Sequence, residues 1–195
     1  MREPDTTLPS TTDLLGPPPV ITGELASAFE ELLDRARDIL KSSDIVEEMW
    51  VRDVVDLEWE IIRYRRLKAH LLLASQYAGL EHVLTPIIGM FEAESLSLRW
   101  AKRDPVAVAQ VDQHLASAGL TVDAVMAETF AARIREVDCI ERMIASAEAR
   151  RADALRELAR HREASAAGLK AAIKKVEDAE YEDIQPQHAA PKVRT

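Results

Sequence analysis

Apolar residues recur at helical spacing through two long stretches of the chain, 44–79 and 122–160. Apolar positions three and four residues apart share one side of a helix, so both stretches predict long amphipathic helices. Within 44–79 the apolar residues form two stripes, and a helix with two such stripes packs between two neighbours. One stripe holds Trp50, Val54, Leu57, Ile61 and Tyr64, and the other holds Val51, Val55, Trp59 and Ile62.

Capping and turn residues divide the first half of the chain. A helix is predicted over 23–41, with Thr22 as its cap and Glu24 in its first turn. Asp44, followed three residues later by Glu47, marks the start of the long helix over 44–79.

Further signals divide the second half. Gly79 and Thr85–Pro86 predict the end of that long helix and the start of another that reaches about Lys102, because proline suits a first helical turn. Asp104–Pro105 predicts a short helix that ends at Gly119, and Thr121 caps the last helix.

The last helix carries a seven-residue repeat. Two series have this spacing: Phe130, Val137 and Ile144, then Leu155, Arg162, Leu169 and Val176. An eleven-residue step separates Ile144 from Leu155, which is the spacing of a stutter in a coiled coil. The portion beyond about Arg160 is expected to overhang the bundle and to be covered by a second chain, since such a helix is costly alone.

These elements predict an all-α fold: an antiparallel helical bundle or hairpin with two long amphipathic helices and coiled-coil character. The helical domain is expected over 22–176. A disordered Pro/Thr-rich tail is expected over 1–21, and an acidic, then disordered, tail over 177–195.

Composition narrows the class of protein. Cys139 is the single cysteine, which excludes an intramolecular disulfide and a Cys-rich metal site, and we expect it in the core or at its boundary. No apolar run approaches the ~20 residues of a membrane helix, and no signal peptide is evident, so no membrane association and a cytoplasmic location are expected. The formal net charge is −9, concentrated in 22–60, where a solvated acidic face is expected.

Motifs for catalysis are missing from the sequence. None of the five histidines follows a glutamate by three residues, as a di-iron helical bundle requires. No glycine-rich phosphate loop or G-x-S-x-G sequence is present. We therefore expect no catalytic, cofactor-binding or metal-binding residues, no small-molecule substrate and no enzyme.

Two basic clusters are candidates for contact with phosphate. The residues are Arg63, Arg65, Arg66, Lys68, Arg150 and Arg151. A surface that follows a nucleic-acid backbone gathers bases on one face, whereas these clusters are interleaved with acidic residues. Ion pairing along the flanks of a coiled coil explains the same pattern.

Two segments resemble a group of uncharacterised helical proteins of alphaproteobacteria. They are VRDVVDLEWEIIRYRRLK (51–68) and CIERMIASAEARRADALRELARHRE (139–163). Some members of that group begin with a basic segment containing Lys-His-Gly, whereas this chain begins with a Pro/Thr-rich one. The resemblance implies a helical fold and no particular activity.

The sequence therefore predicts a non-enzymatic helical interaction or scaffold protein. Its expected partner is a second copy of itself, in a homo-oligomer, or another helical protein. The alternative is a nucleic-acid-associated protein that uses the two basic clusters.

Overall fold

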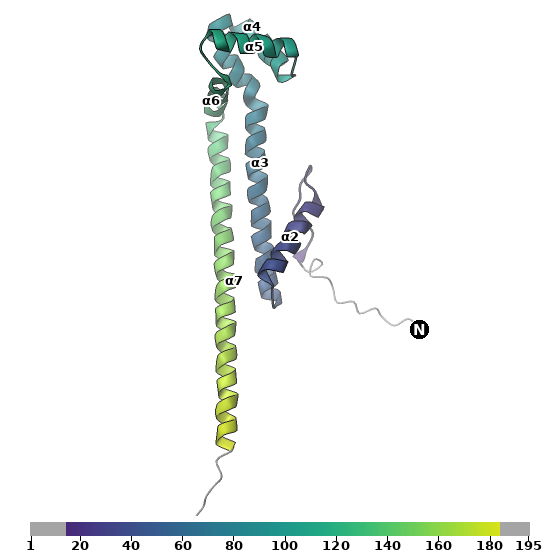
Figure 1. Cartoon of the computed structure of the whole chain (residues 1–195), viewed down its shortest axis with the longest axis vertical. Helices are drawn as coiled ribbons and strands as arrows, with labels where there is room; N and C mark the ends of the chain where they lie inside the picture. Colours follow the sequence, from purple (N-terminus) through teal and green to yellow (C-terminus); the bar gives the residue numbers. More distant parts are fainter. Residues whose placement is uncertain (1–14, 184–195) are drawn as a thin grey trace, which may run out of the picture. The chain divides into compact units, whose positions relative to one another are not determined.

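The computed structural model describes residues 15–183, with side chains through Asp178, and this range contains six helices and no strand. The predicted all-α fold is confirmed. The helices are α2 (Ala26–Leu40), α3 (Ile45–Ile88), α4 (Met90–Ala101), α5 (Pro105–Ser117), α6 (Val122–Ala132) and α7 (Ile134–Asp183) (Figure 1). Most of the two predicted tails, 1–14 and 184–195, lies outside the described residues, so the predicted division into a domain and two tails stays a prediction.

The chain forms two compact units, and the long helices α3 and α7 each contribute a segment to both. In the described range, unit 1 consists of 15–18, 26–54 and 152–183, and unit 2 consists of 19–25 and 55–151.

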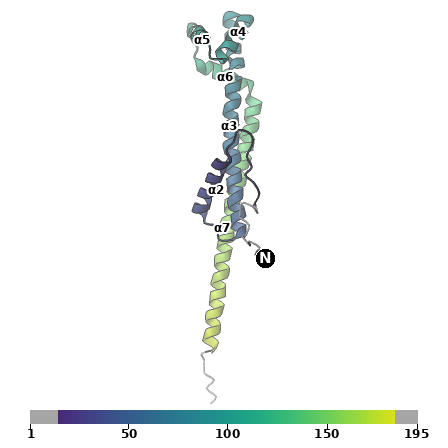
Figure 2. The ribbon, with the colours of Figure 1, turned by 90° about the vertical axis from the view of Figure 1, so that its right-hand side faces the viewer.

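In unit 2, α3 and α7 pack side by side (Figures 1 and 2). Ile61 of α3 is fully buried against Ile144 and Ala147 of α7. The half-buried side chains of Leu57, Tyr64 and Ile140 surround this contact. The contact confirms that the long helices pack through their apolar stripes.

A second core in unit 2 brings four helices together. Its buried residues are Leu80, Val83 and Leu84 of α3, Ala93 and Leu96 of α4, Ala107, Val111 and Leu115 of α5, and Val125 of α6. The predicted start signals hold here, since Asp104 accepts a hydrogen bond from the Val106 amide and Thr121 accepts one from the Asp123 amide. Three short helices, of which α5 and α6 have side-chain caps, therefore form this end of unit 2.

The two predicted stripes of α3 are largely observed. Val51, Val55 and Trp59 are buried, and Ile61 is buried on the other stripe. Ile62 is exposed, so its assignment to a buried stripe was wrong.

The predicted end of the long helix at Gly79, and the start of another at Thr85–Pro86, are wrong. Helix α3 continues to Ile88, and the break falls at Gly89, whose φ of +87° is accessible to glycine. A Cβ on Gly79 would lie 2.1 Å from the Oγ1 atom of Thr129. Glycine at this position therefore lets α6 approach α3 closely. The Thr85 hydroxyl donates to the Glu81 carbonyl of its own helix and caps nothing.

The last helix is also divided, whereas the sequence predicted one element from Val122. Arg133 separates α6 from α7 with φ −114° and ψ 15°. Its side chain donates a hydrogen bond of 3.0 Å to the Ser75 hydroxyl on α3, which holds the break in place. Beyond it, α7 is continuous through Gly168 to Asp183.

Burial along α7 contradicts the predicted stutter. Val137, Ile144 and Leu158 are buried, and half-buried Arg151 occupies the position between the last two, so one seven-residue spacing is kept. Leu155, which was predicted to begin a new series, is 39% exposed. The spacing of apolar residues alone does not reveal this series, because position 151 holds an arginine. The Arg151 guanidinium pairs with Glu58 of α3.

The first helix begins at Ala26, three residues later than predicted, so Thr22 does not cap it. Glu24 consequently lies in the loop before α2, where its carboxylate is buried and bonded to α3.

Candidate functional site

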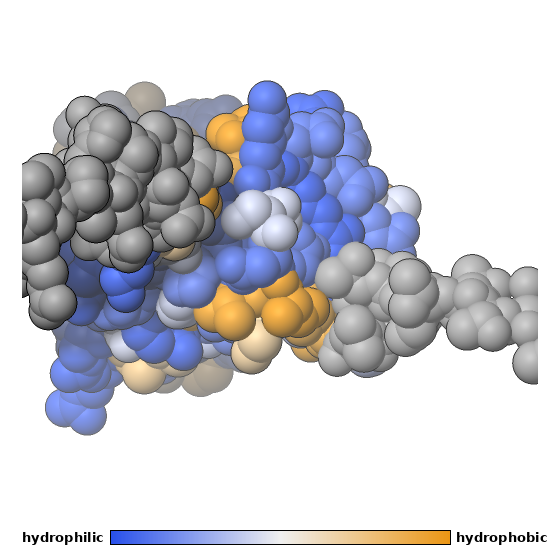
Figure 3. Space-filling model, turned by 90° about the horizontal axis from the view of Figure 1, so that it is seen from below, coloured by the Kyte–Doolittle hydropathy of each residue, from blue (hydrophilic) through white to orange (hydrophobic). Residues whose placement is uncertain are grey.

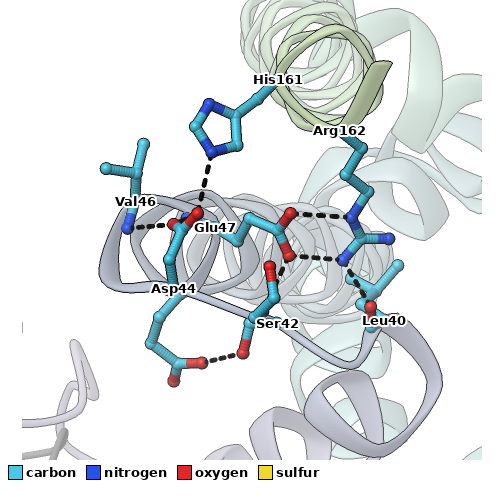
Figure 4. A network of polar contacts seen from close by, with 9 residues as sticks. Leu40, Ser42, Asp44, Val46, Glu47, His161 and Arg162 are labelled. Atoms are coloured by element: carbon cyan, nitrogen blue, oxygen red, sulfur yellow. Dashed lines mark hydrogen bonds and ion pairs between the residues drawn. The ribbon is translucent and has the colours of Figure 1, made fainter. Parts of the chain in front are cut away.

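A polar junction in unit 1 joins the end of α2, the start of α3 and α7 (Figure 4). Arg162 of α7 donates to both carboxylate oxygens of Glu47, with distances of 3.2 and 2.9 Å. The same guanidinium donates to the carbonyl oxygen of Leu40, the last residue of α2. The Arg162 side chain of α7 therefore binds both α2, through Leu40, and α3, through Glu47. The hydrogen bonds from Arg162 also lower the pKa of Glu47.

His161, the neighbour of Arg162, binds the capping residue of α3. Asp44 accepts hydrogen bonds from the amides of Val46 and Glu47 at 2.8 and 2.9 Å, which confirms its predicted role as a cap. Its other carboxylate oxygen lies 2.9 Å from Nε2 of His161, and this contact lowers the pKa of Asp44. The imidazole packs edge-on against Trp50 at 5.3 Å, so its orientation is fixed on two sides.

The junction brings together potential metal ligands that the sequence did not suggest. Oxygen atoms of Asp44 and Glu47 and a ring nitrogen of His161 lie within 4.8 Å of one another. Both oxygens of Glu47 already accept from Arg162, and one also accepts from the Ser43 amide at 3.0 Å. A guanidinium and a helix N-terminus thus supply the positive charge that a metal would bring. The arrangement fits a structural junction better than a metal centre.

A second set of contacts fixes α2 on the first turns of α3. The carboxylate of Glu48 accepts from Arg37 at 2.5 Å and from the Ser42 hydroxyl at 2.6 Å. Arg52 lies over the ring of Phe29, 4.9 Å from its centroid, and donates to the carbonyl of Pro17 at 3.0 Å. These contacts hold both the helix and residues preceding it within unit 1.

In unit 2, Glu24 is a buried carboxylate with four partners. Its side chain is 1% exposed. It accepts from the Trp59 indole at 2.9 Å, from Arg63 at 2.8 Å and from Arg66 at 2.7 Å. It also accepts from the Ile21 amide at 3.1 Å. The hydrogen bonds from Arg63 are the largest cause of a pKa lowered from 4.5 to about 2, against the opposing effect of burial.

Sequence reasoning missed this cluster because it placed Glu24 on a helix. One signal was present: Trp59, Arg63 and Arg66 follow one another by four and three residues, which puts three donors on one side of α3. Such a stripe of donors in a half-buried helix requires an acceptor. The pattern alone does not say which acidic residue accepts these hydrogen bonds.

The six predicted phosphate-contacting residues all lie in unit 2, and each has a carboxylate partner. Arg63 and Arg66 bind Glu24. The remaining pairs cross between α3 and α7: Arg65 with Glu148, Lys68 with Glu141, Arg150 with Glu60 and Arg151 with Glu58. The four crossing pairs are partly exposed, so each contributes at most about 1 kcal/mol, but together they fix the antiparallel register.

An apolar face of α7 is exposed in unit 1. Every residue from 163 to 178 is exposed, including Leu169, Ile173 and Val176 at 63%, 49% and 59%. The three are four and three residues apart, so they share one side of the helix, and we name them the α7 face. Large exposed apolar residues also flank the turn between α2 and α3, among them Ile39 and Met49. Apolar surface is visible among hydrophilic residues in Figure 3.

Cys139 is exposed, so its expected place in the core or at its boundary is wrong. It lines a shallow groove in unit 2 with Tyr64, Arg142 and Arg150. Arg142 pairs with Asp138 at 3.1 Å and Arg150 with Glu60 at 2.9 Å, so both guanidinium groups of the groove are already engaged by carboxylates.

Among the described helices, none is by itself long and apolar enough to cross a membrane; by length and composition only, the pair α5 and α6, bent by 95°, passes the same test.

Comparison with known proteins found no matching family, no matching curated protein and no matching solved structure. The resemblance of 51–68 and 139–163 to helical proteins of alphaproteobacteria therefore stays an expectation.

Proposed function

We propose that the protein is a non-enzymatic helical interaction protein that associates with a second copy of itself through the α7 face. The observation that carries this proposal is the change in burial along α7. Residues 137–158 of this helix repeatedly bury side chains, whereas 163–178 bury none.

No described residue buries a side chain of 163–178, so within the described structure this part of α7 lacks the packing that stabilises a helix. An isolated helix as short as 163–178 is marginally stable in water, because helix propensity alone barely offsets the entropy lost when the chain is ordered. Leu169, Ile173 and Val176 would each gain about 1.5–3 kcal/mol on full burial. A partner helix that covered the α7 face would therefore stabilise both the contact and the helix itself.

The charges beside the α7 face favour a second copy as the partner. Lys170, Lys174 and Lys175 are followed, after Val176, by Glu177 and Asp178. One short helix thus carries both signs of charge next to its apolar side. A copy of the same helix offers the opposite charges as well as the same apolar residues, which a uniformly charged partner would not.

Sedimentation equilibrium at micromolar concentrations tests the proposal. The wild type is expected to form a dimer or higher oligomer, and a variant with Leu169, Ile173 and Val176 all changed to serine is expected to be a monomer. Phe91→Ser is the matched control, because Phe91 is 83% exposed but lies in unit 2. A monomeric wild type would overturn the proposal, and so would dissociation by the control variant alone.

Nucleic-acid association, the alternative from the sequence, stays a prediction. Phosphates would have to compete with the carboxylates that already bind the six basic residues. Titration of a duplex DNA probe at low ionic strength tests it. Binding that weakens steeply with salt, and is lost when Arg65, Arg66 and Lys68 are changed to glutamate, would support the alternative. Absence of salt-dependent binding would exclude it.

A further inference from the structure

A groove of about 250 Å³ in unit 2 lies between α3 and the end of α4. Leu73, Gln76 and Tyr77 of α3 line one side, and Trp100 and Arg103 line the other. Leu73 and Tyr77 are exposed, although both are large and largely apolar. Two aromatic side chains and one aliphatic side chain therefore face a space that no described residue fills.

Of the described residues that line this groove, Arg103 alone is cationic. Its guanidinium lies over the ring of Trp100, 5.6 Å from the centroid, and among the described residues it has no carboxylate partner. Its neighbour Asp104 is bound to Arg99 instead. A guanidinium that stacks on an indole through its flat face keeps its N–H edges available for a carboxylate.

The backbone of Arg103 adds an independent observation. Its φ of +62° lies in the left-handed region, at the position just after the end of α4 where glycine is the usual residue. A residue with a Cβ costs stability there. The chain thus has an arginine with a strained backbone at a point where glycine would satisfy the helix end.

We propose that this groove binds a small aromatic carboxylate. The ring of the ligand would lie against Trp100 and Tyr77, and its carboxylate would accept two hydrogen bonds from Arg103. The size agrees with this class, since a cavity of about 150 Å³ holds benzene and the groove has room for a second ring or a short acidic arm. The inference concerns unit 2 and is independent of self-association through the α7 face.

Nuclear magnetic resonance on the full chain, with the indole N–H of Trp100 as reporter, tests the proposal. The probes are indole-3-acetate and its neutral analogue indole-3-acetamide, which keeps the ring and loses the charge. The acid is expected to shift the Trp100 signal saturably and to bind about tenfold more tightly than the amide, because only the acid forms a charge-assisted pair.

Arg103→Gln is expected to weaken binding of the acid about tenfold and to leave binding of the amide unchanged. Lys41→Gln is the matched control, because Lys41 is the other described non-glycine residue with positive φ and lies in unit 1. Three results would each overturn the proposal: no saturable shift up to about 10 mM acid, equal affinity for acid and amide, or unchanged affinity in Arg103→Gln.

Discussion

Arg162 on α7 binds the carboxylate of Glu47 on α3 through two hydrogen bonds of 3.2 and 2.9 Å, across a separation of 115 residues. The Glu47 side chain is buried, whereas Arg162 is partly exposed. Loss of the arginine would leave a charged carboxylate facing helix α7 without its main partner, and would also free the carbonyl of Leu40.

Arg162→Ala is therefore expected to destabilise unit 1 markedly more than Arg160→Ala. Arg160 is a matched control two residues away, because among the described residues its partner is Glu157 on its own helix and both side chains are exposed. Urea denaturation followed by the fluorescence of Trp50, which contacts His161 beside Arg162, measures the difference. Equal losses for the two variants would show that Glu47 regains water when its partner is removed.

Glu24 predicts a distinct loss of stability in acid. Its pKa in the folded protein is about 2, below its ordinary value of 4.5, so the folded state resists protonation. The resulting stabilisation is complete above about pH 4.5 and is lost as the pH falls from there through about pH 2.

Glu24→Gln is expected to lower the free energy of unfolding by about 2 kcal/mol at neutral pH, because Arg63 and Arg66 lose a charged partner. It should also flatten the pH dependence between about 4.5 and 2. Denaturation series at several pH values, with Trp59 fluorescence as the signal, measure both effects. If the free energy of unfolding fell equally with pH in the wild type and in Glu24→Gln, Glu24 would not be the group that causes the loss of stability in acid.

Gly79 and Gly168 predict opposite responses to the same substitution. A Cβ at Gly79 would meet Thr129 at 2.1 Å and the carbonyl oxygen of Val125 at 2.8 Å, whereas a Cβ at Gly168 would meet nothing within 4 Å. Gly79→Ala is expected to destabilise by about 2–3 kcal/mol, because α3 or α6 must shift. Gly168→Ala is expected to stabilise α7 by about 0.5–1 kcal/mol, as alanine does inside a helix. Thermal unfolding followed by circular dichroism tests both.

Amide hydrogen exchange is expected to change along α7. Residues 137–158 should exchange slowly, because their helix is packed, and 163–178 should exchange quickly in dilute protein. Raising the protein concentration should slow exchange in 163–178 if a second copy covers the α7 face. Rates there that do not change with concentration would argue against self-association through this face.

The helical class of the chain and the starts of α3, α5 and α6 could be predicted from the sequence, because caps are local. Asp44, Asp104 and Thr121 each bind an amide two residues away, and short-range patterns record such contacts. Gly79 was misread for the opposite reason. Its meaning depends on Thr129, fifty residues later, and a glycine needed for close approach looks the same in a sequence as one that ends a helix.

The polar sites were less accessible to prediction. The basic residues were recognised, but their partners lie on another helix or in a loop, so the choice between phosphate and carboxylate could not be made from spacing. Half-buried Arg151 illustrates the same limit: a charged residue at an apolar position ended the visible repeat, although its ion pair with Glu58 lets the helix continue in register.

The crossing ion pairs restrict how the lengths of these helices can change. Four charged residues of α7, from Glu141 to Arg151, pair with residues of α3 that lie progressively nearer its start. One residue inserted there would turn the rest of α7 by about 100° and carry each charge away from its counterpart. Seven residues added to one helix would restore the facing direction but displace the charges by about 10 Å along the axis. Related chains of different length would thus need insertions or deletions of seven residues matched on both helices, whereas the lengths of α4 and α5 are not tied to these ion pairs.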